Sequence, residues 1–276
     1  MTDLHVSASL VLYKPDLPTV ERTLLALQLA GERAKAHYGL MLTMTLVDNS
    51  ADSRIHVQLE RWLQEFATRM PLWNVQLMRS PGNIGYGQGN NLVIKDATSQ
   101  YHIVVNPDLF VAEDALLEAL RFMEARPDAG LLTPAVFDED GERQYLCKRD
   151  PTLLVMFLRS FSPKWLKKRL QSVADHFEMR DWDYEQVIPS VEYPTGCFMF
   201  FRTRTLQQIG GFDPDFFLHY EDADVGRRMR SIAPVVYVPA VKVVHQWARN
   251  THHSFKPMFV TVRSGWLYVR KWGGYW

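Results

Sequence analysis

The first half of the chain alternates strand-like and helix-like segments, and this order limits it to few folds. The strand-like segments are short and apolar, whereas the helix-like segments repeat apolar residues at helical spacing. We predict strands at 6–13, 41–47, 74–79 and 102–105, and helices at 19–35, 57–66, 89–97 and 113–126. Strands that alternate with helices build parallel βαβ units, so we expect an α/β fold with a mainly parallel central sheet flanked by helices.

The second half of the chain is less regular. An Asp140-Gly141 pair between Phe137 and Tyr145 predicts a hairpin. Further strands are expected at 197–201 and 235–238, and a helix is expected to run through Val225 and Met229. We therefore expect a single domain over residues 1–276, with a regular half at 1–135 and an irregular half at 136–276.

Charge and cysteine content exclude several classes of protein. The 276 residues include 31 Lys and Arg and 31 Asp and Glu, whereas a general nucleic-acid binder needs an excess of positive charge. Two cysteines, Cys147 and Cys197, are too few for a disulfide scaffold and match no zinc-ligand spacing. Since the sequence shows neither a signal-peptide pattern nor a bilayer-spanning apolar stretch, we expect a cytoplasmic protein.

The charges are nevertheless segregated along the chain. Residues 143–170 hold eight basic residues against one acid, and the charged segment as a whole covers 143–192. The tail from residue 241 onward holds six basic residues, no acidic ones and four of the eight tryptophans. Such runs are either ordinary solvated faces or sites of contact with an anionic, partly apolar partner such as a membrane surface.

Polar residues follow three of the predicted strands at their carboxyl ends, where open α/β sheets bind ligands. The glycine-rich loop at 82–91 lacks the Gly-Lys-Ser/Thr of a Walker loop, so it is either a turn into a helix or a close backbone approach to a nucleotide. Asp108 follows an apolar strand and a proline, which makes it either a turn residue or a ligand for Mg²⁺ or Mn²⁺.

Five acidic residues lie between 213 and 224 with no basic residue among them. Acids wedged between aromatic residues are costly unless a cation or a proton-transfer role compensates. Asp222 is therefore either a helix cap or a catalytic group, whereas Arg227 and Arg228 assign Asp224 a structural role. His245 ends an apolar run and is either a packed residue or part of a metal site.

Taken together and in this order, these segments resemble the family 2 glycosyltransferases of the GT-A fold, most closely the bacterial rhamnosyltransferase-like branch. The resemblance covers nearly the whole chain. It rests on Ser9-Leu10-Val11-Leu12-Tyr13, Val47-Asp48-Asn49-Ser50, Asn83-Ile84-Gly85-Tyr86-Gly87, Asn106-Pro107-Asp108, Gly210-Gly211-Phe212-Asp213, Glu221-Asp222-Ala223-Asp224 and His245.

The resemblance implies that the half at 1–135 binds a nucleotide sugar and that the half at 136–276 binds the acceptor and carries out catalysis. It implies a catalytic base at Asp222 and a divalent cation, Mg²⁺ or Mn²⁺, at Asp108 and His245. The implied donor-binding residues are Tyr13, Asp48, Arg79, Asn83, Gly85 and Asn106, and the acceptor-binding residues are Thr195, Gly196 and Glu221. Because Asn106 replaces the first acid of the family's Asp-x-Asp motif, we expect weaker metal binding.

We therefore expect an inverting transferase that moves L-rhamnose from dTDP-L-rhamnose, with UDP-sugars as the second donor class, to a lipid-linked glycan. The product would enter a bacterial surface polysaccharide such as O-antigen, lipopolysaccharide or capsule, at the inner face of the cytoplasmic membrane. Two alternatives stay open: a sugar-phosphate nucleotidyltransferase, whose N-terminal glycine-rich loop this sequence lacks, and a non-catalytic nucleotide-sugar-binding module.

Overall fold

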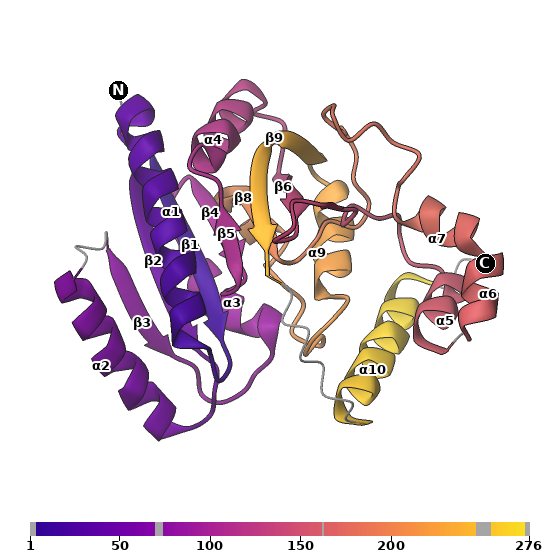
Figure 1. The fold of residues 1–276 in the computed structure, drawn as a ribbon, viewed down its shortest axis with the longest axis horizontal. Helices are drawn as coiled ribbons and strands as arrows, with labels where there is room; N and C mark the ends of the chain where they lie inside the picture. The colour runs from indigo at the N-terminus through magenta and orange to yellow at the C-terminus, as the bar shows by residue number, and fades with distance from the viewer. Residues whose placement is uncertain (1–3, 70–73, 162, 247–254, 274–276) are drawn as a thin grey trace.

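The computed structural model describes residues 4–69, 74–161, 163–246 and 255–273, and these residues form one nine-stranded sheet flanked by helices (Figure 1). The sheet order is β3-β2-β1-β4-β8-β6-β9-β5, and β7 pairs with β6. Among the described residues no helix combines the length and apolar character that a membrane-spanning helix needs. The strands are β1 (His5–Leu12), β2 (Met41–Asp48), β3 (Val75–Arg79), β4 (Tyr101–Val105), β5 (Leu109–Val111), β6 (Leu131–Phe137), β7 (Arg143–Gln144), β8 (Phe198–Arg202) and β9 (Val235–His245).

The N-terminal half has the predicted βαβ arrangement. Strands β3, β2, β1 and β4 lie side by side and parallel, and they are connected through α1 (Leu17–Tyr38), α2 (Ser53–Arg69) and α3 (Tyr86–Ile94). Asp16 caps the start of α1 by accepting a hydrogen bond from the Thr19 N–H, and Gly39, in the left-handed region, caps its end. Helix α3 begins three residues before the predicted start, and α4 (Ala115–Ala125) follows the short strand β5.

The second half adds mostly antiparallel strands to the same sheet. The predicted hairpin is confirmed, because β6 and β7 pair antiparallel with Phe137 opposite Arg143. Strand β8 runs antiparallel to β4, and β9 extends the predicted strand at 235–238 as far as His245. The sequence prediction missed β5 and five helices: α5 (Leu153–Phe161), α6 (Lys164–Arg169), α7 (Gln171–Phe177), α8 (Thr203–Gln208) and α10 (Phe255–Trp272).

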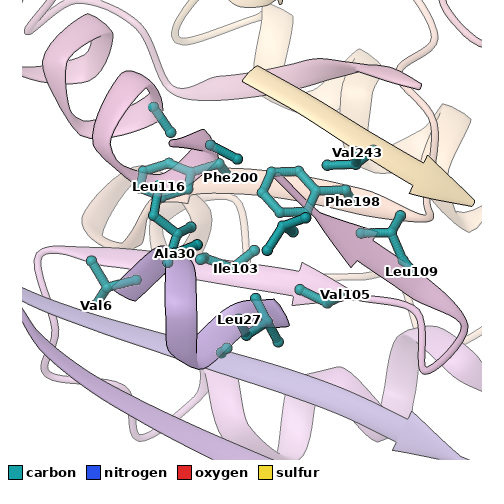
Figure 2. Close-up of a cluster of buried hydrophobic side chains, with 14 of the residues drawn as sticks. Val6, Leu27, Ala30, Ile103, Val105, Leu109, Leu116, Phe198, Phe200 and Val243 are labelled. Atoms are coloured by element: carbon teal, nitrogen blue, oxygen red, sulfur yellow. The ribbon is translucent and has the colours of Figure 1, made fainter. Parts of the chain in front are cut away.

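The sheet is buried on both faces. Successive residues of a strand point to opposite sides, so Ile103 and Val105 enter one apolar cluster and Val104 enters another. The first cluster packs against α1, α2 and α4, and Figure 2 shows Leu27 and Leu116 meeting strand residues there. The second cluster packs against α3, α8 and α9 (Glu221–Arg230), which therefore lie on the opposite face. This two-sided burial makes the sheet a rigid frame for its strand ends.

The predicted basic, aromatic tail is only partly described. Trp266 and Trp272 lie on α10, whereas Trp247 and Trp276 fall outside the described residues. In Figure 1, α10 lies beside α5 and α6 at the end of the molecule opposite α2.

Candidate active site

A cleft of about 940 Å³ opens at the carboxyl ends of β1 and β4. Parallel neighbours end at the same edge of a sheet, so the residues that follow β1 and β4 meet there. Four of the predicted site residues line this cleft, namely Tyr13, Asn106, Asp108 and His245. Tyr86 and the acidic turn at 138–140 line the cleft as well, so residues from both halves of the chain form its walls.

Asp108 and His245 meet in this cleft although they are far apart in the sequence. Strands β5 and β9 pair so that Leu109 lies opposite His245, which places His245 Nε2 3.3 Å from Asp108 Oδ1. Asp108 Oδ1 is shielded from solvent and accepts no hydrogen bond from the described residues. The Thr23 hydroxyl holds the preceding turn by donating to the Pro107 carbonyl oxygen over 2.8 Å.

This pair fits a divalent cation as two of its ligands. A carboxylate oxygen and an imidazole nitrogen at this separation can bind one ion together. No group of three or more His, Cys, Asp and Glu side chains with metal-binding geometry occurs in the described ranges. The protein therefore offers two ligands, and a phosphate-bearing substrate or water would have to supply the others.

The glycine-rich loop is held close to the β2 strand end by Asn49. The buried Asn49 side chain donates to Asn83 Oδ1 and to the Gly85 carbonyl oxygen, each over 3.2 Å, and accepts from the Ile84 N–H. Gly85 has φ +91°, and a Cβ atom there would lie 2.3 Å from the Phe217 carbonyl oxygen. Glycine is therefore required where this loop passes the segment that leads into α9.

Asp222 lies in the first turn of α9, beside the cleft. Its Oδ2 accepts a hydrogen bond from the Gly196 N–H over 3.1 Å, and its Oδ1 accepts from the Ala223 N–H over 3.0 Å. The Gly196 carbonyl oxygen in turn accepts from the hydroxyl of Tyr86, a cleft residue. The next residue, Cys197, makes a second backbone link to the cleft. Its carbonyl oxygen accepts a hydrogen bond from the Asn106 N–H over 2.9 Å.

Glu221 precedes Asp222 but meets different surroundings. Its side chain is buried, and its Oε2 has no hydrogen-bond partner among the described residues. Burial, reinforced by the neighbouring Asp222 carboxylate, raises the pKa of Glu221 to about 8. The surroundings of Glu221 therefore favour its neutral form, whereas the neighbouring Asp222 accepts hydrogen bonds from two backbone N–H groups. The chain enters this turn through His219 and Tyr220, which both have positive φ.

Eight of the twelve predicted site residues are not part of the cleft lining, and three of these, Asp48, Arg79 and Thr195, are described by their own surroundings. Asp48 is buried, with one carboxylate oxygen accepting from the Ser50 N–H and the other 3.0 Å from His56 Nδ1. Arg79 is exposed at the end of β3, and the Thr195 hydroxyl is buried and donates to the Cys197 sulfur over 3.3 Å. Their proposed contacts with donor and acceptor stay predictions.

Several residues that shape the site could not be identified from the sequence. Asn49 and Tyr86 belong to a strand end and a loop, but their contacts to Asn83 and Gly196 depend on the tertiary fold. The acidic turn at 138–140 predicts a hairpin, and the structure shows that it also lines the cleft. An Asp-rich turn after a strand was the one available signal.

The structural role predicted for Asp224 is confirmed. This fully buried carboxylate accepts from Arg228 Nε over 2.7 Å, from Lys271 Nζ over 2.8 Å and from Trp272 Nε1 over 2.9 Å. Arg227 instead faces Asp150 at 3.6 Å. Asp224 therefore anchors α10 to α9, two residues after Asp222.

Curated proteins with similar sequences are rhamnosyltransferases. The chain is 29% identical to the N-acetylglucosaminyl-diphospho-decaprenol L-rhamnosyltransferase of Mycobacterium tuberculosis, over 96% of this chain and 87% of that protein. It is 26% identical to the rhamnosyltransferase WbbL of Escherichia coli strain K12, over 64% of this chain and 66% of that protein.

Solved structures with a similar fold include GalNAc-T7 with UDP, GalNAc and Mn²⁺, at a TM-score of 0.65, 14% identity and coverage of 98% of this chain. They also include the mannosyltransferase PcManGT of Pyrobaculum calidifontis with GDP-Man and Mn²⁺, at a TM-score of 0.62, 17% identity and 96% coverage. The chain spans 48% and 64% of these two solved chains. At such identities the similarity shows the fold, and it confirms the expected GT-A architecture.

The family comparison agrees with the relatives and with the fold. The model of glycosyl transferase family 2 matches residues 19–203, about two thirds of the chain. This range contains the glycine-rich loop, Asp108 and Gly196, although it ends before Asp222 and His245. The chain therefore belongs to glycosyl transferase family 2, as a rhamnosyltransferase-like glycosyltransferase.

Proposed function

We propose that this glycosyltransferase moves L-rhamnose from dTDP-L-rhamnose to a hydroxyl group of a lipid-linked glycan, with inversion at the anomeric carbon. The product would enter a bacterial surface polysaccharide such as O-antigen, lipopolysaccharide or capsule. The names of both curated relatives support rhamnose as the sugar, and the name of the mycobacterial relative supports an acceptor on a lipid diphosphate. An acceptor of this kind favours a reaction in the cytoplasm, at the inner face of the membrane.

One observation carries the proposal: the Asp222 carboxylate is held by the Gly196 N–H beside a cleft that contains Asp108 and His245. In this mechanism Asp222 takes the proton of the acceptor hydroxyl while its oxygen attacks the anomeric carbon. The bond from that carbon to the diphosphate oxygen breaks, and the diphosphate leaves with the electron pair. A positioned carboxylate base contributes roughly 10²- to 10⁴-fold to such a rate.

Asp108 and His245 would hold a divalent cation, Mg²⁺ or Mn²⁺, which when bound stabilises the charge on the leaving diphosphate as a Lewis acid. The Mn²⁺ in both similar solved structures supports this assignment. Tyr13 and Asn106 would contact the nucleotide from the cleft wall, and Asn83 and Gly85 would contact it from the loop. Asp48 and Arg79 complete the proposed donor site, and Thr195 and Gly196 the proposed acceptor side.

The test is a donor screen with the purified chain and a lipid-diphosphate-linked N-acetylglucosamine acceptor, read by mass spectrometry. The panel holds dTDP-, UDP- and GDP-sugars, each with and without Mn²⁺ or Mg²⁺. We expect the acceptor to gain one deoxyhexose from dTDP-L-rhamnose, and we expect chelation to slow the reaction. Transfer from another donor would overturn the assigned sugar. Absence of both transfer and donor hydrolysis would favour the non-catalytic binding module.

A further inference from the structure

Three helices of the second half carry positive charge only. Helices α5, α6 and α10 contain no acidic residue, although the whole chain has equal numbers of acidic and basic residues. Their nine basic residues are Arg159, Lys164, Lys167, Lys168, Arg169, Lys256, Arg263, Arg270 and Lys271. Lys168, Arg169, Arg263 and Arg270 have exposed side chains. This part of the molecule therefore attracts anions.

The same helices expose large apolar side chains. Among the described residues fourteen large apolar side chains are exposed, and six of them lie on these three helices: Leu154, Phe157, Trp165, Phe259, Val262 and Trp266. On α10, Phe259 is 71% exposed and Trp266 is 58% exposed. Phe259, Val262 and Trp266 are spaced three and four residues apart, so they form one stripe along the helix.

The stripe is not needed to hold α10 in place. The opposite side of the helix does that, because Tyr268 is buried and the Ser264 hydroxyl donates to the Leu218 carbonyl oxygen over 2.8 Å. Gly265 faces Met156 of α5, so α5 and α10 pack together, and α6 follows α5 directly. Figure 1 shows the three helices gathered at one end of the molecule, away from α1 and α2.

We propose that α5, α6 and α10 form a docking surface for an anionic lipid bilayer. The docking surface consists of the six apolar side chains named above together with Lys168, Arg169, Arg263 and Arg270. Aromatic and aliphatic side chains enter the headgroup region, while basic side chains pair with lipid phosphates. The choice of a membrane as partner rests on the proposed function, in which the acceptor is carried by a lipid.

A small cavity lies between α5, α10 and the segment that leads into α9. It has a volume of about 270 Å³ and is lined by Met156 of α5, Thr261 of α10, and His219 and Tyr220, which lead into the turn of Asp222. A lipid-linked acceptor that reaches the molecule at these helices is therefore close to the proposed base.

A second copy of the chain fits the docking surface less well than a membrane does. A symmetric dimer through this surface would bring basic residues of one copy against basic residues of the other, and no acid on these helices would compensate. Nucleic acid would match the charge but leave the apolar stripe unexplained.

Flotation of the purified full chain with vesicles tests the docking surface. We expect the chain to float with vesicles of phosphatidylcholine and phosphatidylglycerol, at least roughly tenfold more than with phosphatidylcholine alone, and less at high salt. Two double variants should each weaken binding to anionic vesicles at least roughly tenfold: Phe259→Ala/Trp266→Ala and Arg263→Glu/Arg270→Glu. All these side chains are exposed, so circular dichroism should show an unchanged fold.

Matched variants outside the docking surface serve as controls. Trp182→Ala removes an exposed tryptophan, and Arg33→Glu/Arg61→Glu reverses two exposed charges on α1 and α2, and both should float like the wild type. Equal flotation of the wild type and the docking variants would overturn the proposal. A dimer in light scattering that both docking doubles dissolve, without vesicle binding by the wild type, would identify a second copy as the occupant.

Transfer to a water-soluble, short-chain acceptor separates this proposal from the proposed function. The docking variants should retain that activity while losing vesicle binding. If the wild type floats but transfers no sugar, the docking surface stands and the proposed function falls. If the wild type transfers sugar but does not float with vesicles, the proposed function stands and the docking surface falls.

Discussion

Two neighbouring carboxyl groups in the first turn of α9 have different surroundings. Asp222 accepts hydrogen bonds from two backbone N–H groups. Glu221 is buried without a described partner for its Oε2, and burial raises the pKa of its carboxyl group. The two side chains are therefore expected to differ in their chemistry, with Asp222 as the proposed base and Glu221 as a neighbour whose neutral form is favoured.

Replacing Asp222 by Asn should remove the proposed base while keeping its shape. The free energy of unfolding should change by about 1 kcal/mol or less, as for a helix-terminal carboxylate. The kcat/KM for sugar transfer should fall at least roughly a hundredfold. Asp215→Asn, an exposed acid in the same segment, is the matched control and should leave turnover unchanged. Near-normal turnover of Asp222→Asn would mean that Asp222 is only a cap.

Glu221 should make the stability of the fold depend on pH. Between its ordinary pKa of 4.5 and its folded value of about 8, the folded chain holds a proton that the unfolded chain has released. Raising the pH through this window therefore lowers the free energy of unfolding, by up to about 1.4 kcal/mol per pH unit. Urea unfolding at several pH values should show this decline in the wild type.

Glu221→Gln should flatten the decline, because the amide has no proton to lose. Glu113→Gln, at an exposed position, should keep the wild-type pH dependence. Identical curves for the wild type and Glu221→Gln would contradict the assigned protonation state.

At the scale of elements, the segment that leads into α9 is braced from two sides. On one side the Asn91 side chain of α3 donates to the Phe212 carbonyl oxygen over 2.7 Å, and the Tyr86 N–H donates to Phe217 over 3.0 Å. On the other side α10 contacts the segment through the Ser264 hydroxyl and through the bonds of Lys271 and Trp272 to Asp224. The position of Asp222 therefore depends on contacts outside its own helix.

Gly85→Ala should disturb the contact between the glycine-rich loop and the segment that leads into α9. The new Cβ would meet the Phe217 carbonyl oxygen, and the positive φ would be strained, so the free energy of unfolding should fall by about 1 to 3 kcal/mol. Transfer activity should fall with it, because the loop also borders the proposed donor site. Gly82→Ala in the same loop has open space and should change stability by no more than about 0.5 kcal/mol. Equal denaturation midpoints for the two variants would contradict the close approach.

Lys271→Met should weaken the contact between α10 and α9. The substitution removes a cation from the buried Asp224 and from Asp213, while Arg228 and Trp272 continue to hold Asp224. Because the lysine side chain is one-third exposed, we expect a loss of only about 1 to 2 kcal/mol in urea unfolding. Lys168→Met, at an exposed position on α6, should have no measurable effect, and a similar loss there would argue against a specific anchor.

At the scale of the whole molecule, the cleft joins the two halves of the chain. Tyr13 and Asn106 line it from the first half, and His245 and the turn at 138–140 line it from the second. One sheet runs through both halves, because β8 of the second half pairs with β4 of the first. A ligand in this cleft should therefore stabilise the entire fold.

Thermal unfolding with dTDP and Mn²⁺ tests this coupling. At a ligand concentration about a hundred times its Kd, the free energy of unfolding should rise by about 2.7 kcal/mol, which raises the Tm by several degrees. Mn²⁺ should increase the stabilisation by dTDP in the wild type but not in Asp108→Asn, which lacks the charged ligand. If Mn²⁺ has the same effect on both proteins, Asp108 does not hold the cation.

The amino-acid sequence alone predicted most elements of the first half of the chain and four residues that line the cleft. Strand and helix periodicity is a local property, so the parallel sheet, the hairpin after β6 and the polar residues at the strand ends could be predicted. Asp108 and His245 could be named as partners only through a family resemblance, and the pairing of β5 with β9 brings them together.

The surroundings of each side chain come from the tertiary structure. It turned Asp48 toward His56, buried Glu221, made Asn49 the anchor of the glycine-rich loop and placed α10 against α9. None of these outcomes follows from local pattern, because burial and hydrogen-bond partners depend on segments far apart in the sequence. The same long-range packing raises the pKa of the Glu221 carboxyl group, because burial disfavours its charged form.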